Sequence, residues 1–388
     1  MSSALFSIGF RPFYLGAAVF ATLAVPAWYG AYAGWLPFSA TLPGLAWHAH
    51  EMVFGFAPAV IGGFLLTAVR AWTGRMTPAG ATLAALFGVW VLGRVLMLTG
   101  PAPLAVAVDL AYLPLLALAL AVPLWQARNR RNAFVVPLLL TLALLSATHH
   151  GAYRGWVDPL WAARSQTVAM DLVAMLLAVI GGRVTPAFSA NAIRGLQPKR
   201  WPLVEGVALG GLALVILLDL TGFAAELPAW LLSFVFVLAA LAHLVRWLGW
   251  QPWKTRSNVL LLVLPLGYLW LPVHLLLRAS VDVVPGLMSP LALHALSVGA
   301  MAGLMLAMMT RSALGHTGRP LAAGPAETFM FAAIHLAALA RVFGPLLWPA
   351  GYVTWVGLSA ALWVLAFGAF AISYAPIVSR PRVDAATA

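Results

Sequence analysis

Continuous apolar runs cover nearly all of this chain and constrain its fold more than any other feature. Of its 388 residues, 63% are hydrophobic and only 8% are charged. Each run has roughly 20 residues, the length that a helix needs to cross a hydrocarbon layer about 30 Å thick. We therefore expect an integral membrane protein with about twelve transmembrane helices, near residues 14–34, 50–70, 80–99, 103–125, 132–151, 163–183, 203–222, 227–248, 258–278, 287–310, 326–347 and 350–376.

The runs favour an all-α bundle over a membrane β-barrel. Strands of such a barrel alternate apolar and polar residues, whereas these runs are uninterrupted. A helix also satisfies its own backbone hydrogen bonds where water is absent. Because the loops are short and no internal repeat stands out, we expect one membrane domain over residues 1–388, with tails 1–13 and 377–388 in the cytoplasm.

The net charge of +12 arises mainly from arginines at the two ends of the chain and in every second loop. In a polytopic protein, basic loops stay on the cytoplasmic side, so both termini are predicted to be cytoplasmic. This distribution favours a membrane protein over a nucleic-acid-binding protein. The absence of cysteine excludes disulfides, iron–sulfur clusters and covalently attached c-type haem, so a metal is left with histidine, methionine, carboxylate, tyrosine or backbone ligands.

Histidines gather in the outer halves of the predicted helices. Seven of the nine lie there, namely His48, His50, His149, His150, His274, His294 and His335. Ionisable side chains within a membrane are costly and usually face the bundle interior, and imidazole suits copper, iron and zinc. We therefore predict that these histidines bind a metal or haem. The alternative, an interhelical hydrogen bond, stays open for His274 and His335 in particular.

Two histidine pairs stand out. His48 and His50 straddle the predicted start of a helix, where two ligands spaced i, i+2 can converge on one ion. His149 and His150 are adjacent and point about 100° apart in a helix, so we expect one of them to face a shared site. Glu51 follows the first pair, either as an acid stabilised by the helix dipole or as a catalytic proton donor beside the metal.

Other charged residues lie at the same depth. They are Arg94, Asp109, Arg154, Arg164, Asp171, Asp219, Arg278 and Arg341. A guanidinium group forms paired hydrogen bonds with carboxylates such as the propionates of haem. Arg94 and Arg341, followed by Arg278, are the predicted propionate partners.

Three segments at the inner face are richer than plain connectors: GFRPF at 9–13, GGRVTPAFSAN at 181–191 and TRSALGHTGRP at 310–320. Glycine-rich turns with basic side chains can bind anions, although positive loops are also an ordinary sign of topology. The candidate inner-face polar site consists of Arg11, Arg183, Asn191, Arg311, His316 and Arg319. No nucleotide-binding glycine motif is present in the sequence.

Several strings together resemble the NnrS family of bacterial membrane proteins, from residue 9 to about residue 345. They are GFRPFYLGA, WHAHEMVFGF, GGFLLTAVRAWTGR, GRVTPAFSAN, HALSVGAM and TRSALGHTGRP. The resemblance implies a multi-pass protein of the bacterial inner membrane that contains haem and copper. Because the chain has no cysteine, the expected haem is b-type. The resemblance further implies a role in the response to nitric oxide and nitrosative stress and in denitrification. The family's HxHE motif falls on His48, His50 and Glu51, its tenth-span histidine on His294, and its GHTGR loop on Gly315–Arg319.

The resemblance implies that the protein binds nitric oxide and contributes to its detoxification. Reductive removal would convert two nitric oxide molecules, two electrons and two protons into nitrous oxide and water, which makes the protein a candidate oxidoreductase. The electrons would come from a quinol or an external donor. Two alternatives stay open: a non-catalytic, metal-binding protein or sensor of nitrosative stress, and a twelve-helix transporter.

Overall fold

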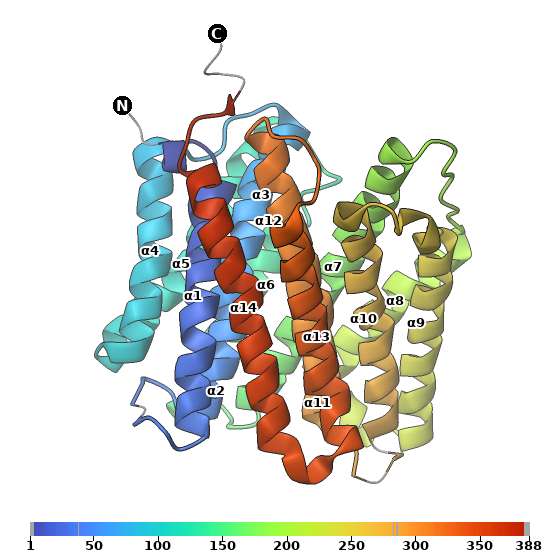
Figure 1. Cartoon of the computed structure of the whole chain (residues 1–388). Helices are drawn as coiled ribbons and strands as arrows, with labels where there is room; N and C mark the ends of the chain where they lie inside the picture. Colours follow the sequence, from blue (N-terminus) through green and yellow to red (C-terminus); the bar gives the residue numbers. More distant parts are fainter. Residues whose placement is uncertain (1–3, 38, 282, 285, 384–388) are drawn as a thin grey trace. The chain divides into compact units, whose positions relative to one another are not determined.

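A computed structural model describes residues 4–37, 39–281, 283–284 and 286–383 of the chain (Figure 1). Within these residues the regular structure is helical, and no strand occurs among them. Twelve helices are long and apolar enough to cross a membrane. The prediction of an all-α, multi-pass membrane protein is confirmed.

The helices are α1 (Phe10–Tyr32), α2 (Gly44–His50), η2 (Glu51–Phe56), α3 (Ala57–Thr73), α4 (Gly80–Thr99), α5 (Ala102–Gln126), α6 (Val135–Tyr153), α7 (Trp161–Ala192), α8 (Pro202–Thr221), α9 (Ala229–Gly249), α10 (Val259–Val281), α11 (Ser289–His294), η5 (Ala295–Ala302), α12 (Gly303–His316), α13 (Pro325–Leu347) and α14 (Tyr352–Val378). Short 3₁₀ turns are η1 (Ala4–Phe6), η3 (Phe223–Glu226), η4 (Pro252–Thr255) and η6 (Pro349–Gly351). The segments α2–η2–α3 and α11–η5–α12 each form one continuous membrane span.

Several helices extend beyond the predicted ends, which corrects the interpretation of the inner-face segments as loops. All of GGRVTPAFSAN belongs to α7, and the first seven residues of TRSALGHTGRP belong to α12. In soluble proteins, glycine and proline indicate turns. Membrane helices tolerate both residues, because neighbouring helices satisfy the freed hydrogen-bonding groups of the backbone. These segments are therefore helix ends rather than glycine-rich turns.

Two spans contain a π-helical segment, and each begins directly after a histidine. η2 follows His50, and η5 follows His294. The wider π turn is uncommon and is found mostly at functional sites. In both segments a glycine stands five residues after the histidine, and its missing side chain leaves room for a larger neighbour: Arg94 beside Gly55, and Trp270 beside Gly299.

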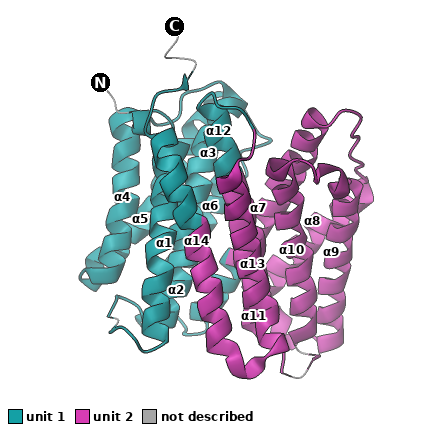
Figure 2. Ribbon diagram, in the orientation of Figure 1, with its two compact units in different colours: residues 1–169, 308–321, 367–388 teal, residues 170–307, 322–366 magenta. Residues whose placement is uncertain are grey.

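The helices form two compact units (Figure 2). Unit 1 comprises residues 1–169, 308–321 and 367–388, and unit 2 comprises residues 170–307 and 322–366. Helices α7, α12 and α14 are divided between the units. The single membrane domain stays a prediction, and each unit is described by itself below.

In unit 1, small residues let α3 pack closely against α1. A Cβ atom on Gly63 would lie 2.9 Å from Cβ of Phe13 and 3.0 Å from the ring of Tyr14, and both aromatic side chains are fully buried. Close approach through glycine is a common way for membrane helices to associate, because lipid provides no hydrophobic drive between them.

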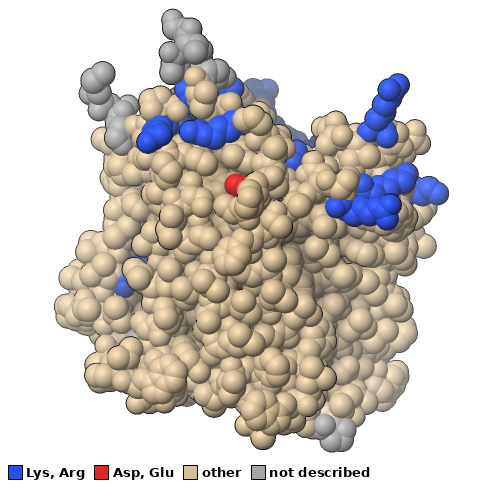
Figure 3. Space-filling model, in the orientation of Figure 1, with Lys and Arg blue, Asp and Glu red and all other residues tan. Residues whose placement is uncertain are grey.

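Most of the lysines and arginines visible on unit 1 lie at the end where α12 and α14 finish (Figure 3). This one-sided charge agrees with the rule that places basic loops in the cytoplasm. The orientation of the termini stays a prediction.

The packing of Gly63 predicts opposite effects for two glycine-to-alanine variants. Gly63→Ala should destabilise the protein by about 1–3 kcal/mol, because the new methyl group overfills the contact with α1. Gly88 in α4 is exposed, and a Cβ there would meet nothing within 4 Å, so Gly88→Ala should leave stability unchanged or raise it. Thermal unfolding in detergent measures both; equal melting temperatures would contradict the packing.

Candidate metal centre

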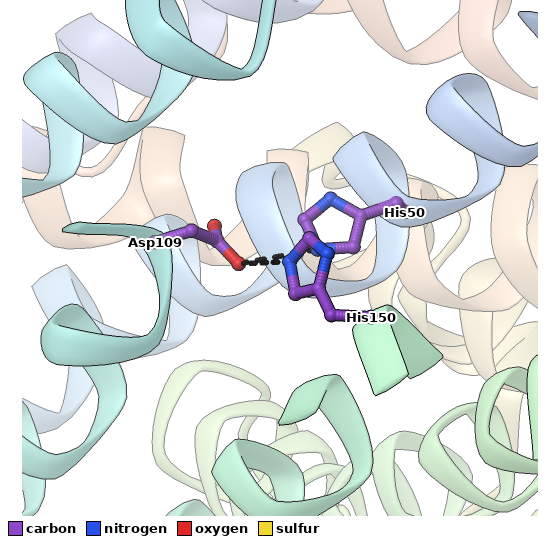
Figure 4. A group of neighbouring side chains, drawn as sticks. All are labelled: His50, Asp109 and His150. Atoms are coloured by element: carbon purple, nitrogen blue, oxygen red, sulfur yellow. Dashed lines mark hydrogen bonds and ion pairs between the residues drawn. The ribbon is translucent and has the colours of Figure 1, made fainter. Parts of the chain in front are cut away.

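Three buried side chains of unit 1 meet as potential metal ligands: His50, Asp109 and His150 (Figure 4). His50 ends α2, Asp109 lies in α5 and His150 lies in α6. Oδ2 of Asp109 is 3.2 Å from Nε2 of His50 and 3.0 Å from Nε2 of His150. The three ligand atoms all lie within 4.8 Å of one another, so one small cation can contact all of them.

The local sequence explains why the charged groups reach the same depth. Helices α4 and α5 form a hairpin whose turn lies at Gly100 and Pro101. Arg94 lies in the last turns of α4, and Asp109 lies about two turns after the start of α5. The helical rise of about 1.5 Å per residue therefore brings the two side chains level with each other.

Arg94 holds two carboxylates at the centre of the cluster. Its Nη1 donates to Oε1 of Glu51 at 2.7 Å, and its Nη2 donates to Oδ1 of Asp109. The side chains of all three residues are at most 5% exposed. With both carboxylates ionised, two negative charges face one positive charge, and an unbalanced buried charge is costly. The cluster therefore favours a further cation.

The hydrogen bonds of His50 indicate where that cation belongs. Nδ1 of His50 lies 3.0 Å from Oε1 of Glu51, and because a carboxylate only accepts, Nδ1 carries the proton. In a neutral imidazole this leaves a lone pair on Nε2, which makes no hydrogen bond although it faces the Asp109 oxygen. Two acceptors thus face each other, an arrangement that a shared metal ion satisfies.

The donor set fits a transition metal. Two imidazole nitrogens and one carboxylate oxygen suit copper, zinc or iron. The contact between Glu51 and Nδ1 of His50 is the carboxylate–histidine contact that orients metal ligands in many proteins. Around Asp109, the hydroxyl of Ser146 donates to Oδ2 at 3.3 Å.

Gly55 makes room for Arg94. A Cβ atom on this residue of η2 would collide with the Arg94 guanidinium, so a side chain would displace the arginine. The carbonyl of Gly55 also accepts a 2.9 Å hydrogen bond from Nε1 of Trp90, one turn before Arg94 in α4. Gly55 thus contributes to the site because it has no side chain.

The structure does not bring His48 and His149 into the ligand group. Helix α2 begins at Gly44, so residues two apart point to nearly opposite sides, and His48 stacks on Trp28 with ring centroids 4.0 Å apart. His149 flanks the cluster: its ring lies 5.6 Å from the His50 ring, and its Nδ1 contacts the carbonyl of Ala162 at 3.0 Å. The predicted start of this span at residue 50 was wrong. The predicted convergence of His48 and His50 on one ion depended on that start.

Unit 2 contains a second arginine between two acids. Arg278 donates to Asp171 at 3.1 Å and to Asp219 at 2.8 Å, which ties α10 to α7 and α8. Its guanidinium lies 4.4 Å from the centre of the Phe236 ring. Like Arg94, it already serves two carboxylates of the protein.

The remaining outer histidines, which were predicted to bind a metal or haem, also lie in unit 2. His274 donates from Nδ1 to the carbonyl of Ala292 at 2.7 Å, and its buried Nε2 makes no hydrogen bond. His294 donates from Nδ1 to the carbonyl of Pro290 at 2.6 Å. His335 instead accepts at Nδ1 from Nε1 of a tryptophan, at 3.2 Å.

Arg341 in α13 differs from the two bridging arginines. Its Nη2 donates to the hydroxyl of Tyr352 at 2.9 Å, whereas its buried Nη1 makes no hydrogen bond. Arg341 therefore keeps a donor for a further acceptor.

The predicted inner-face residues are divided between the units. Arg11, Arg311, His316 and Arg319 belong to unit 1, whereas Arg183 and Asn191 belong to unit 2. A single inner-face site made of all six stays a prediction.

Asp109 is the ligand that the sequence interpretation did not choose. The sequence placed it among the charged residues at the depth of the histidines, but histidines alone were the predicted ligands. Its position in the sequence could have indicated this role. A short hairpin turn places Asp109 level with Arg94, and both lie at the depth of the HAHE string.

A family model described as NnrS protein matches residues 4–382, nearly the whole chain. No curated protein matches the chain at a significant level.

The charge balance predicts a large effect for Arg94→Gln. Removing the guanidinium leaves two buried carboxylates without their cation, which should cost about 3–5 kcal/mol of stability. Arg75→Gln removes the same charge from an exposed residue and should have little effect. Thermal unfolding of the metal-free proteins tests this; equal stability of the two variants would contradict the central role of Arg94.

Proposed function

The chain belongs to the NnrS family, and we propose that it is a haem- and copper-containing protein of the bacterial inner membrane that binds nitric oxide at a metal site and removes it by reductive chemistry. Family membership fits a role in the response to nitric oxide, and the twelve candidate spans indicate a multi-pass membrane protein. The observation that carries the proposal is the buried group of His50, Asp109 and His150.

In this proposal, Nε2 of His50, Nε2 of His150 and Oδ2 of Asp109 would hold the copper ion, which would replace the proton that Nε2 of His150 donates to Asp109. The unpaired Nε2 of His50 and the excess negative charge of the cluster support this assignment. When bound, copper supplies a Lewis-acidic, redox-active position for nitric oxide. The chain supplies orientation, burial and protons.

Glu51 is the proposed proton carrier. Its Oε1 is held by Arg94 and His50, whereas its buried Oε2 makes no hydrogen bond. Oε2 is therefore the atom that takes up a proton and delivers it beside the ligand group. Arg94 acts as a positioning residue, because it fixes Glu51 and Asp109 relative to each other.

The proposed b-type haem belongs to unit 2. His274 would be the better ligand for the haem iron, since its Nδ1 proton is held by a backbone carbonyl and its Nε2 keeps a lone pair. His335 has the opposite tautomer when neutral, with a proton on Nε2, and suits a hydrogen-bond donor. Arg341, with its buried unpaired Nη1, is the preferred partner for a propionate.

The reaction combines two nitric oxide molecules, two electrons and two protons into nitrous oxide and water. Both electrons come from a quinol or another external donor, because the chain has no cysteine for an iron–sulfur cluster or c-type haem. The oxygen atom released as nitrous oxide forms takes up both protons and becomes water, and the Glu51 route delivers these protons.

Histidine variants test the copper site. His50→Ala and His150→Ala should each weaken copper binding by more than about tenfold, because each removes a ligand nitrogen. His48→Ala is the matched control from the same helix and should retain copper, since its ring stacks on Trp28 instead. Copper content of purified, folded protein measures the difference.

Equal copper content in all three variants would refute the ligand assignment. Loss of copper from His48→Ala but not from His150→Ala would favour the HxH pair of the sequence motif.

A second prediction concerns haem and turnover. The reduced-minus-oxidised optical spectrum should show a haem band that shifts with nitric oxide and is lost in His274→Ala but kept in His335→Gln. With an added donor, the wild-type protein should consume many equivalents of nitric oxide and release nitrous oxide. Consumption of one equivalent without nitrous oxide would instead support a non-catalytic binding protein, and a spectrum without haem would refute the haem assignment.

A further inference from the structure

The GHTGR segment of unit 1 forms the end of helix α12. The amide of Thr317 donates to the carbonyl of Ala313 at 3.2 Å, and the amide of Arg319 donates to the carbonyl of Leu314 at 2.9 Å. Gly318 has a φ of +75°, the left-handed conformation that glycine adopts readily after a helix. The motif thus fixes the positions of His316 and Arg319 on the last turn.

Three segments of unit 1 meet at this helix end. The amide of Val383 donates to the carbonyl of Thr317 at 3.1 Å, which ties residues after α14 to the motif. Nη1 of Arg11, in the first turn of α1, donates to the carbonyls of Val378 at 2.8 Å and Arg380 at 2.6 Å. The ring centroids of His316 and Phe10 lie 5.8 Å apart.

The meeting point gathers basic side chains, which we call the terminal basic cluster: Arg11, Arg70, His316, Arg319 and Arg382. Arg319 acts electrostatically on Arg11, and Arg70 and Arg382 act on His316. Such a gathering of cations is unfavourable unless an anion offsets it.

The carboxylates in the described part of unit 1 do not offset this charge. Glu51 and Asp109 pair with Arg94 in the metal cluster. Asp158 lies between α6 and α7, where its Oδ1 accepts a 2.8 Å hydrogen bond from the amide of Leu160. Asp384 falls outside the described residues.

Two guanidinium groups in the cluster carry buried donors without an acceptor. Arg11 is 3% exposed, and its Nε makes no hydrogen bond. Nη1 of Arg319 is likewise buried without a hydrogen bond. A buried donor on a charged group that lacks a partner is costly, so both atoms point to a missing acceptor.

We propose that the terminal basic cluster is a binding site for a phosphate group. Guanidinium groups recognise phosphate through several hydrogen bonds at once, and the buried donors of Arg11 and Arg319 supply them. His316, a member of the cluster, is exposed. The phosphate group belongs either to free phosphate or to the headgroup of an anionic lipid.

The test uses full-length protein in nanodiscs of phosphatidylcholine, titrated with inorganic phosphate by calorimetry. Native mass spectrometry of protein in nanodiscs that also contain phosphatidic acid measures lipid binding. Arg319→Gln should weaken whichever ligand binds by about tenfold, since it removes a hydrogen bond to a charged group. Arg75→Gln removes an equal charge from an exposed residue of the same unit and should bind like wild type.

Each outcome has one meaning. Saturable binding of inorganic phosphate supports the site with a free anion, and retention of phosphatidic acid alone supports it with a lipid headgroup. Absence of both, or an equal loss in Arg319→Gln and Arg75→Gln, would overturn the proposal. Binding that occurs only in Asp384→Asn would also overturn it, because the chain's own carboxylate would then fill the site. Equal melting temperatures of the variants exclude misfolding as the cause.

Discussion

The contact of one buried guanidinium group with two carboxylates is the interaction on which the candidate metal centre of unit 1 depends. Arg94 joins α4 to Asp109 of α5 and to Glu51 at the start of η2. Where water is absent, such a group is tolerated only when it is paired, so each of the three helices depends on the other two. Unit 2 uses the same arrangement, with Arg278 between Asp171 and Asp219.

The metal centre also depends on backbone geometry. The π-helical turn after His50 occurs where two consecutive side chains both take part in the cluster, and Gly55 within it leaves space for Arg94. Uncommon helical geometry and a missing side chain thus serve the same contact. If position 55 carried a side chain, Arg94 would be displaced from its contact with the carboxylates, even with the histidines and Glu51 in place.

The sequence predicted the apolar spans well because each run is longer than any soluble core helix requires. It predicted helix ends poorly, because GGRVTPAFSAN and TRSALGH contain residues that break helices in water but continue α7 and α12 here. The ends matter for the site: α2 starts at Gly44, so His48 and His50 point to opposite sides. The sequence could predict the depth of Asp109. Its contacts with His50 and His150 could not be predicted, because they depend on the register of α5 against two other helices.

Depth in the membrane selects candidate histidines, and the hydrogen bond at Nδ1 distinguishes their roles. His50 and His274 donate from Nδ1, so Nε2 is left as a lone pair that can bind a metal. His335 accepts at Nδ1, so its neutral form presents a proton at Nε2. The seven outer histidines are therefore not equivalent. In the proposed function the two kinds serve different purposes: an Nε2 lone pair binds a metal, whereas an Nε2–H group can stabilise charge that develops on a bound ligand.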